Sequence, residues 1–162
     1  MPSTIIVQGS ARGDGNTTAV AQELSDRLAA PIINLLRYRV HPYTYAQAYP
    51  ADDQFIHLIQ RCLGYERIIL ATPVYWYAMS AQLKTFLDRF TDLLQSHKHL
   101  GRQLRGKHLG VLSCANDAAV NASFYDAFRL TAEYLGMEYA GEWHGWLADG
   151  VVQLMFAGRG NG

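Results

Sequence analysis

The sequence lacks the features that mark several large classes of protein. Its two cysteines, Cys62 and Cys114, form neither a CxxC pair nor a disulfide framework, so we expect a protein of the reducing cytoplasm. Lys and Arg number 14, as do Asp and Glu, so the excess positive charge on which binding to nucleic acids and anionic membranes depends is missing. No apolar run reaches the ~18 residues of a membrane span, and residues 1–4 lack the basic start of a signal peptide. The histidines show no metal-ligand spacing, so we expect no metal.

What the sequence does contain is typical of a single globular domain spanning residues 1–162. Hydrophobic residues make up 49% of the chain, and its length is enough to bury a core without disulfides or metals. No repeat, low-complexity block or linker divides it. Charged residues are scarce at 17%, where about 25% is usual, which indicates that a partner or a ligand covers part of the surface.

Short apolar segments alternate with helical patterns along the chain. We expect strands at residues 4–7, 32–36, 68–71, 109–112 and 139–143. We expect helices at residues 16–30, 52–63, 79–94 and 120–135, an irregular segment at 37–51 and a flexible tail at 157–162. Because each strand is apolar throughout, the pattern predicts a parallel sheet with both faces covered. Five strands in this length fit an α/β, doubly wound, flavodoxin-like sheet of order 2-1-3-4-5.

The loop after the first strand has the composition of an anion site. In open sheets of this kind, ligands bind beyond the carboxyl ends of the strands, close to the start of a helix. Glycines let the backbone fold tightly here, and five polar or cationic side chains surround the expected helix start: Ser10, Arg12, Asn16, Thr17 and Thr18. The loop is neither a Walker motif nor a dinucleotide fingerprint, which leaves a terminal monophosphate, as in FMN. The alternative is an ordinary turn followed by a capped helix.

The loop after the third strand favours a flat ligand. It runs Pro73, Val74, Tyr75, Trp76 and Tyr77. Three adjacent aromatic side chains cannot all face one core, so in this loop they can line a planar ring system. The alternative is that Tyr75 and Trp76 are core residues that anchor the loop.

The loop after the fourth strand lies beside the same ligand by topology. Ser113 and Asn116 are the expected contacts with the ring, unless they only cap the following helix. Cys114 has no resolving cysteine near it in the sequence, so a small buried residue is favoured over a redox role. Lys84 and Asp88, four residues apart in the expected helix 79–94, are interpreted as a solvated or subunit-bridging ion pair rather than a catalytic pair.

Two motifs carry a resemblance to a known family. The first is Gly9-Ser10-x-Arg12 with Gly15-Asn16-Thr17, and the second is TPVYWYAMSAQLKTFLDR at residues 72–89. From residue 5 to about residue 117, the chain resembles the NAD(P)H-dependent FMN reductases and iron–sulfur flavoproteins of the flavodoxin-like superfamily. The resemblance implies FMN, with its ring held by residues 73–77 and by the third loop. It assigns the phosphate to the first-loop residues Ser10, Arg12, Asn16, Thr17 and Thr18.

One departure from the iron–sulfur branch concerns the stretch between the second strand and the second helix, where that branch has a compact cysteine cluster. Residues 37–53 contain no cysteine, so we expect no iron–sulfur centre. Tyrosines occupy the stretch instead, at positions 38, 43, 45 and 49. Packing of a long loop is favoured for them over a roof for a substrate pocket.

The expected function is that of an FMN-dependent oxidoreductase. A hydride passes from NAD(P)H to the flavin and the electrons go on to a quinone-like or other small acceptor, with no obligatory side-chain acid or base. One alternative is an electron carrier of flavodoxin type, against which the zero net charge counts; another is a flavin-free interaction module. Because the expected helix 120–135 is apolar on more than one face, we also expect a homodimer or homotetramer. The resemblance to this superfamily also implies a flavin pocket built across such an interface, as its members often have.

Overall fold

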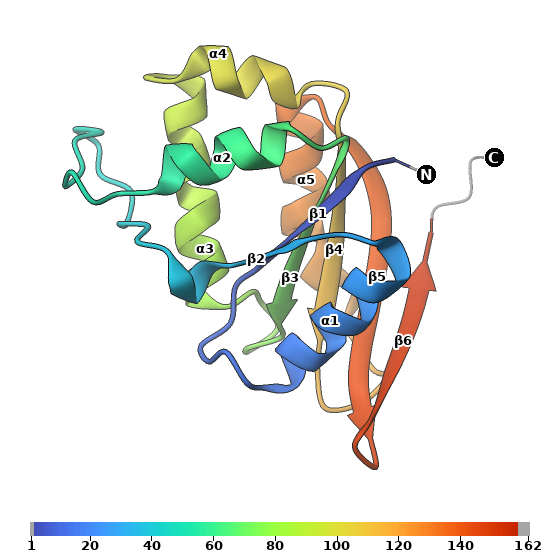
Figure 1. Ribbon diagram of the computed structural model, residues 1–162. Coiled ribbons are helices and arrows are strands. Elements are labelled where there is room, and N and C mark those ends of the chain that lie inside the picture. The colour runs from blue at the N-terminus through green and yellow to red at the C-terminus, as the bar shows by residue number, and fades with distance from the viewer. Residues whose placement is uncertain (1, 159–162) are drawn as a thin grey trace.

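The computed structural model describes residues 2–158, and Figure 1 shows the course of the chain. Its strands are β1 (Thr4–Gln8), β2 (Ile32–Asn34), β3 (Arg67–Pro73), β4 (His108–Cys114), β5 (Glu138–Ala148) and β6 (Val151–Ala157). Its α-helices are α1 (Asn16–Leu28), α2 (Phe55–Leu63), α3 (Ala81–Asp88), α4 (Lys98–Gly101) and α5 (Asp126–Leu135). Its short 3₁₀ helices are η1 (Leu35–Arg37), η2 (Arg89–Leu94), η3 (Arg102–Leu104) and η4 (Ala122–Tyr125).

The strands form one sheet of order β2-β1-β3-β4-β5-β6. The first five strands run parallel, with Ile6 opposite Ile69 in the β1–β3 pair, so the predicted order 2-1-3-4-5 is confirmed. The central strands β1, β3 and β4 are buried on both faces, as expected for a parallel sheet, whereas β2 and β5 are buried only in part.

The sixth strand, β6, is a feature that the sequence-based prediction misses. It pairs antiparallel with β5 through a turn in which Asp149 and Gly150 both have positive φ, 51° and 76°. Two positive φ values mark a type I′ hairpin turn, and Asp-Gly is one of its commonest sequences, so this dipeptide is the overlooked signal. Because β5 pairs with β6, it continues to Ala148 instead of ending at residue 143. Ala157, expected in the tail, is the last residue of β6; residues 159–162 lie outside the described part of the chain.

Two of the expected helices are divided. Residues 79–94 form α3 and then η2, in which Arg89 Nε donates to Asp92 Oδ2 at 2.8 Å. A 3₁₀ turn of three residues places side chains at i and i+3 above one another, which suits this pair. Residues 120–135 form η4 and then α5, and the side chain of Asn121 caps η4. Across residues 2–158, no helix has both the length and the apolar character needed to cross a membrane.

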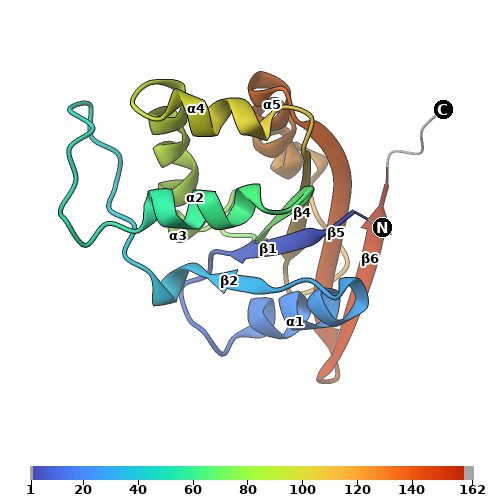
Figure 2. The same ribbon diagram turned by 45° about the horizontal axis from the view of Figure 1, so that its top comes forward.

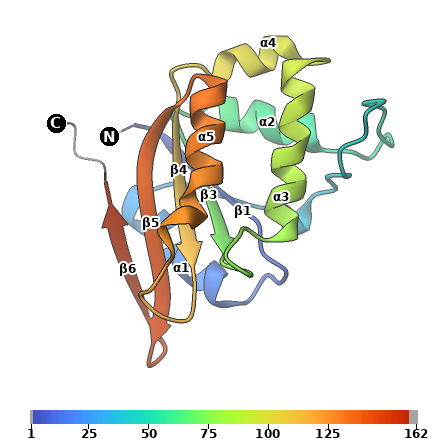
Figure 3. The ribbon, with the colours of Figure 1, turned by 180° about the vertical axis from the view of Figure 1, so that it is seen from behind.

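The two faces of the sheet are covered unequally. The helices α2, α3, α4 and α5 lie on one face, where Phe55, Phe86 and Phe128 belong to the larger core cluster (Figures 1 and 3). On the other face, α1 packs against the sheet, and Val152 and Leu154 of β6 join its smaller cluster. β6 thus extends the sheet at its edge and contributes side chains to the cluster between the sheet and α1.

A buried arginine, Arg89, fastens the irregular segment between η1 and α2 to the helical layer. Its side chain is 1% exposed and donates to both carboxylate oxygens of Asp53, at 2.7 and 3.0 Å, and to the carbonyl oxygen of His41 at 2.9 Å. Its guanidinium carbon lies 3.4 Å from the centre of the Tyr49 ring. Figure 2 shows the segment projecting from the body of the molecule. The Arg89 contacts hold the segment where it leaves and rejoins that body.

The tyrosines of this segment differ in their surroundings. Tyr38 packs against the larger core cluster, and Tyr49 donates a hydrogen bond to Asp92 at 2.9 Å. Tyr45 is 95% exposed and meets Tyr43 edge to face. Packing therefore accounts for Tyr38 and Tyr49, whereas Tyr45 faces solvent.

Replacing Asp53 by asparagine should lower the free energy of unfolding by about 3 kcal/mol at neutral pH, because the buried Arg89 loses its bidentate charged partner. Burial alone raises the pKa of Asp53, but hydrogen bonds from Arg89 and from two backbone N–H groups outweigh it and hold that pKa below its ordinary value. The stabilisation is therefore complete above the unfolded-state pKa of about 3.9 and is lost as the pH falls through the lower folded-state pKa. Denaturant unfolding at several pH values measures both effects, and the difference between wild type and variant should shrink in acid.

Asp88→Asn is the matched control, because Asp88 pairs with Lys84 on the exposed side of α3. It should change the free energy of unfolding by less than about 0.5 kcal/mol. Equal losses for the two substitutions at neutral pH would contradict the role given to the Arg89–Asp53 pair.

Candidate functional site

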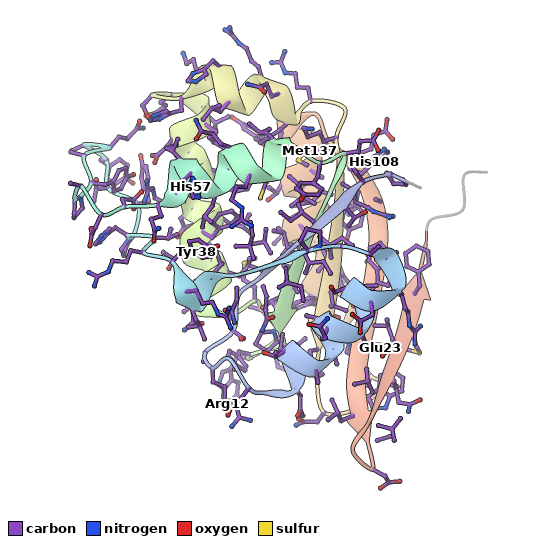
Figure 4. All side chains as sticks on the ribbon, viewed as in Figure 1. Arg12, Glu23, Tyr38, His57, His108 and Met137 are labelled. Carbon is purple, nitrogen blue, oxygen red and sulfur yellow. The ribbon has the colours of Figure 1, made fainter. Side chains whose placement is uncertain are left out.

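A cavity of about 320 Å³ opens at the carboxyl ends of β1, β3 and β4, where the three loops singled out from the sequence meet. In Figure 4, Arg12 marks this end of the molecule, and His108 at the start of β4 lies at the opposite end. The volume falls in the usual range for small-ligand sites, ~300–1,000 Å³. Residues from all three loops line the cavity: Ser10, Arg12, Gly15, Asn16, Thr17, Pro73, Val74, Tyr75, Cys114, Ala115 and Asn116.

Most of the expected site residues therefore line this one cavity, but the expected set and the observed lining differ in both directions. Thr18, Trp76, Tyr77 and Ser113 were expected there and do not line the cavity. Three further residues line it without having been expected: Gly15, Cys114 and Ala115.

The first loop presents backbone donors at the start of α1. Gly15 is the N-cap residue, and its carbonyl oxygen accepts hydrogen bonds from the N–H groups of Thr18 and Ala19. Within residues 2–158, the backbone N–H groups of Asn16 and Thr17 have no hydrogen-bond acceptor, and no side chain caps the helix. These donors, the positive end of the helix dipole and the exposed guanidinium of Arg12 form a suitable environment for an anion.

The second loop is joined to the first by a hydrogen bond and a close packing contact at Gly9. The hydroxyl of Ser80 donates to the carbonyl oxygen of Gly9 at 2.7 Å and accepts from the N–H of Leu83 at 3.2 Å. A Cβ atom on residue 9 would lie 2.7 Å from the Cβ atom of Leu83, so only glycine permits this approach. The capped start of α3 thus sets the distance between the two loops.

The aromatic part of the second loop is a tight turn. The N–H of Tyr75 donates to the carbonyl oxygen of Ala78 at 2.9 Å, and the reciprocal hydrogen bond measures 3.0 Å. The two central residues, Trp76 and Tyr77, have φ values of 49° and 65°, a backbone region that bulky side chains rarely adopt. Tyr75 lines the cavity, whereas Trp76 and Tyr77 are 94% and 72% exposed and do not line it.

Ser113, expected as a contact of the ring, lies in the interior instead. Its hydroxyl oxygen is 2.6 Å from Tyr125 Oη and 2.7 Å from His144 Nδ1. His144 Nε2 lies 2.8 Å from the carbonyl oxygen of Asp117, so this buried network ties the third loop to β5. Because side chains alternate along a strand, Cys114 faces the side of α1 and reaches the cavity.

The cavity offers hydrogen-bond donors, one cation and apolar surface. Among the residues that line it in the described chain there is no carboxylate, imidazole or amine side chain. Burial raises the pKa of Cys114, and its hydrogen bond with Thr17 offsets this only in part, so the thiol is uncharged at neutral pH. Such a wall suits a ligand that carries its own reactive group and has an anionic end near Arg12.

Comparison with known proteins agrees with a ligand that carries its own reactive group. The family model of NADPH-dependent FMN reductases matches residues 2–146. YwqN of Bacillus subtilis, described as an NAD(P)H-dependent FMN-containing oxidoreductase, is 28% identical over 145 residues, which cover 84% of this chain and 80% of YwqN. An iron–sulfur flavoprotein of Methanocaldococcus jannaschii is 29% identical over 118 residues, which cover 66% of this chain and 58% of that protein. Among solved structures, the Trp repressor binding protein from Bacillus subtilis gives a TM-score of 0.70 at 25% identity, over 90% of this chain and 88% of that one.

Replacing Arg12 by methionine should raise the dissociation constant for FMN about tenfold or more, because a charge-assisted hydrogen bond to phosphate contributes ~1.5–3 kcal/mol. The dissociation constant for riboflavin, which lacks the phosphate, should change far less. Quenching of flavin fluorescence by the flavin-free protein measures both constants. Arg37→Met, on the exposed surface of η1, is the matched control and should change neither. Equal weakening of FMN and riboflavin by Arg12→Met would show that Arg12 does not contact the phosphate.

Proposed function

The chain belongs to the NADPH-dependent FMN reductase family and is an FMN-dependent NAD(P)H oxidoreductase, and we propose that its electron acceptor is a quinone or a similar small, flat molecule. The observation that carries the proposal is the cavity whose wall joins an anion site to an aromatic and apolar surface. We further propose that residues 1–162 act as one domain, in the cytoplasm. The free cysteines Cys62 and Cys114 are consistent with that reducing compartment.

The residues at the start of α1 fit the phosphate of FMN. We propose that Arg12, Asn16 and Thr17 donate to it through the guanidinium, the amide groups and the backbone N–H groups. Ser10 and Thr18 shape the same loop, since their hydroxyls donate to the carbonyl oxygens of residues 12 and 13. The donor set contains no acidic side chain that would repel a phosphate.

The other two loops fit the flavin ring. We propose that Pro73, Val74 and Tyr75 contact one part of the ring and that Ala115 and Asn116 contact another. FMN bound there supplies the redox chemistry, because its ring accepts a hydride from NAD(P)H and passes electrons to the acceptor. The protein orients the ring and limits the access of water, and the exposed aromatic pair Trp76 and Tyr77 offers a stacking surface for a flat acceptor beside the ring.

Anaerobic addition of NADH or NADPH should bleach the absorbance of the bound flavin, and a quinone should restore it over many turnovers. The physical reason is that the cavity that would hold the ring is open, so a second flat molecule can reach it. Stopped-flow absorbance and steady-state oxidation of NAD(P)H measure the two half-reactions. An electron carrier of flavodoxin type would bind FMN and show no appreciable turnover with NAD(P)H, and that result would contradict the proposed acceptor reaction.

An apolar groove between η2 and α5 supports a homodimer or homotetramer. It encloses about 290 Å³ and is lined by Leu87, Phe90, Thr91, Leu94, Leu130, Thr131, Tyr134 and Leu135. Leu130 is 53% exposed and Tyr134 is 76% exposed, so both side chains face solvent in the single subunit. We propose that a second copy covers this groove, because a two-fold pair places the same apolar surface on both sides of the interface.

Leu130→Glu should convert the assembly to monomers, because it places a charge in the centre of the proposed interface. Size-exclusion chromatography with light scattering measures the mass. Val151→Glu is the control, since Val151 is 61% exposed on β6, where Met155 and Phe156 are also exposed. Dissociation by Val151→Glu with no effect of Leu130→Glu would place the interface on β6 and contradict the proposal.

A further inference from the structure

The side chain of Gln8 occupies a buried position beneath the first loop. Gln8 is the last residue of β1 and is 1% exposed. Its Nε2 group donates to Ser10 Oγ at 3.2 Å and to Thr18 Oγ1 at 2.7 Å. One carboxamide thus joins the beginning of the loop to the first turn of α1.

The hydroxyl groups that Gln8 contacts also donate hydrogen bonds to the backbone of the loop. Ser10 Oγ donates to the carbonyl oxygen of Arg12 at 2.7 Å, and Thr18 Oγ1 donates to the carbonyl oxygen of Gly13 at 2.9 Å. Each hydroxyl has a single proton, so both protons are used on backbone carbonyls, while the lone pairs accept from Gln8. The chain of donors runs from Gln8 through each hydroxyl to one carbonyl oxygen.

The direction of these carbonyls matters for an anion. A carbonyl oxygen that faced the cavity would repel a phosphate, whereas one turned toward a hydroxyl leaves the anion to the N–H groups. In a trans peptide the C=O and N–H bonds point in opposite directions, so holding the carbonyls of Arg12 and Gly13 also fixes the N–H groups of the residues that follow. The N–H groups fixed in this way are those of residues 13 and 14. Gln8 therefore acts by holding two carbonyl oxygens on the hydroxyls of Ser10 and Thr18, which leaves the anion to Arg12 and to the free N–H groups of Asn16 and Thr17.

We propose that Gln8 is a positioning residue that makes the first loop selective for a flavin bearing a terminal phosphate over one without it. It acts through Ser10 and Thr18 and does not touch the phosphate itself. The inference rests on the proposed placement of the FMN phosphate at the start of α1.

Glutamine is suited to this position by its donors and its length. Asparagine is one methylene shorter and cannot span both hydroxyls from the same backbone position. Glutamate has the length but no donor when ionised, and it would bring a negative charge beneath the phosphate. Methionine has a similar length without donors, so Gln8→Met removes the two hydrogen bonds and keeps most of the packing.

The dissociation constants of flavin-free wild type and Gln8→Met for FMN and for riboflavin, measured by quenching of flavin fluorescence, test the proposal. Gln8→Met should weaken FMN about tenfold and riboflavin less than about threefold, so the preference for FMN falls. Ile6→Val is the control, since Ile6 is buried two residues earlier on the same face of β1. It should lower the thermal midpoint and leave the preference for FMN unchanged.

A second variant keeps the test decisive if Gln8→Met does not fold. The double substitution Ser10→Ala with Thr18→Val removes the same links from their other end and should lower the preference for FMN to a similar extent. An unchanged preference in these variants, or an equal weakening of both flavins, would overturn the role of Gln8. A wild-type protein that binds riboflavin as tightly as FMN would instead overturn the proposed phosphate site, and the inference with it.

Discussion

The close approach of Gly9 to the first turn of α3 is the contact on which the candidate site depends. Because residue 9 has no side chain, Leu83 packs directly on its backbone and Ser80 donates to its carbonyl oxygen. The first and second loops are therefore fixed relative to one another across β1 and β3 by the protein alone. A larger residue at position 9 would push α3 away, and the cavity would lose one of its walls.

Buried polar side chains hold the segments that have no regular structure. Gln8 supports the first loop, His144 supports the third, and Arg89 holds the segment between η1 and α2. Each has hydrogen-bond partners at normal distances, which offsets the cost of removing polar groups from water. The segment held by Arg89 contains no cysteine, so ion pairs, rather than metal–thiolate bonds, stabilise its conformation, although one relative is an iron–sulfur flavoprotein.

The turn at Trp76 and Tyr77 retains a conformation that costs ~1–3 kcal/mol for each such residue. The reciprocal hydrogen bonds between Tyr75 and Ala78 hold it in place, and it leaves two exposed aromatic side chains directly after the cavity-lining Tyr75. The wall of the cavity, by contrast, carries no carboxylate, imidazole or amine side chain among the described residues. Both features agree with a member of a family whose chemistry resides in FMN, where the protein has to bind and orient flat molecules.

Local patterns in the sequence were enough to predict the first five strands, their order and the three loops that line the cavity, although residues 35 and 36, expected in the second strand, belong to η1. Apolar runs, glycine-rich turns and capping residues act over a few neighbouring positions, so the sequence displays them directly. The Asp-Gly turn before β6 is a local signal of the same kind.

Tertiary structure alone decided which side chains of these elements meet the ligand and which lie inside. Arg89 looks like a surface residue beside Asp88, yet its partners Asp53 and His41 lie 36 and 48 residues away in the sequence. Ser113 and Cys114 are adjacent, and only the packing of the sheet between α1 and α5 determines which one reaches the cavity. The reason is physical: a local pattern specifies backbone conformation, whereas burial and ion pairing depend on segments that meet only after the chain has folded.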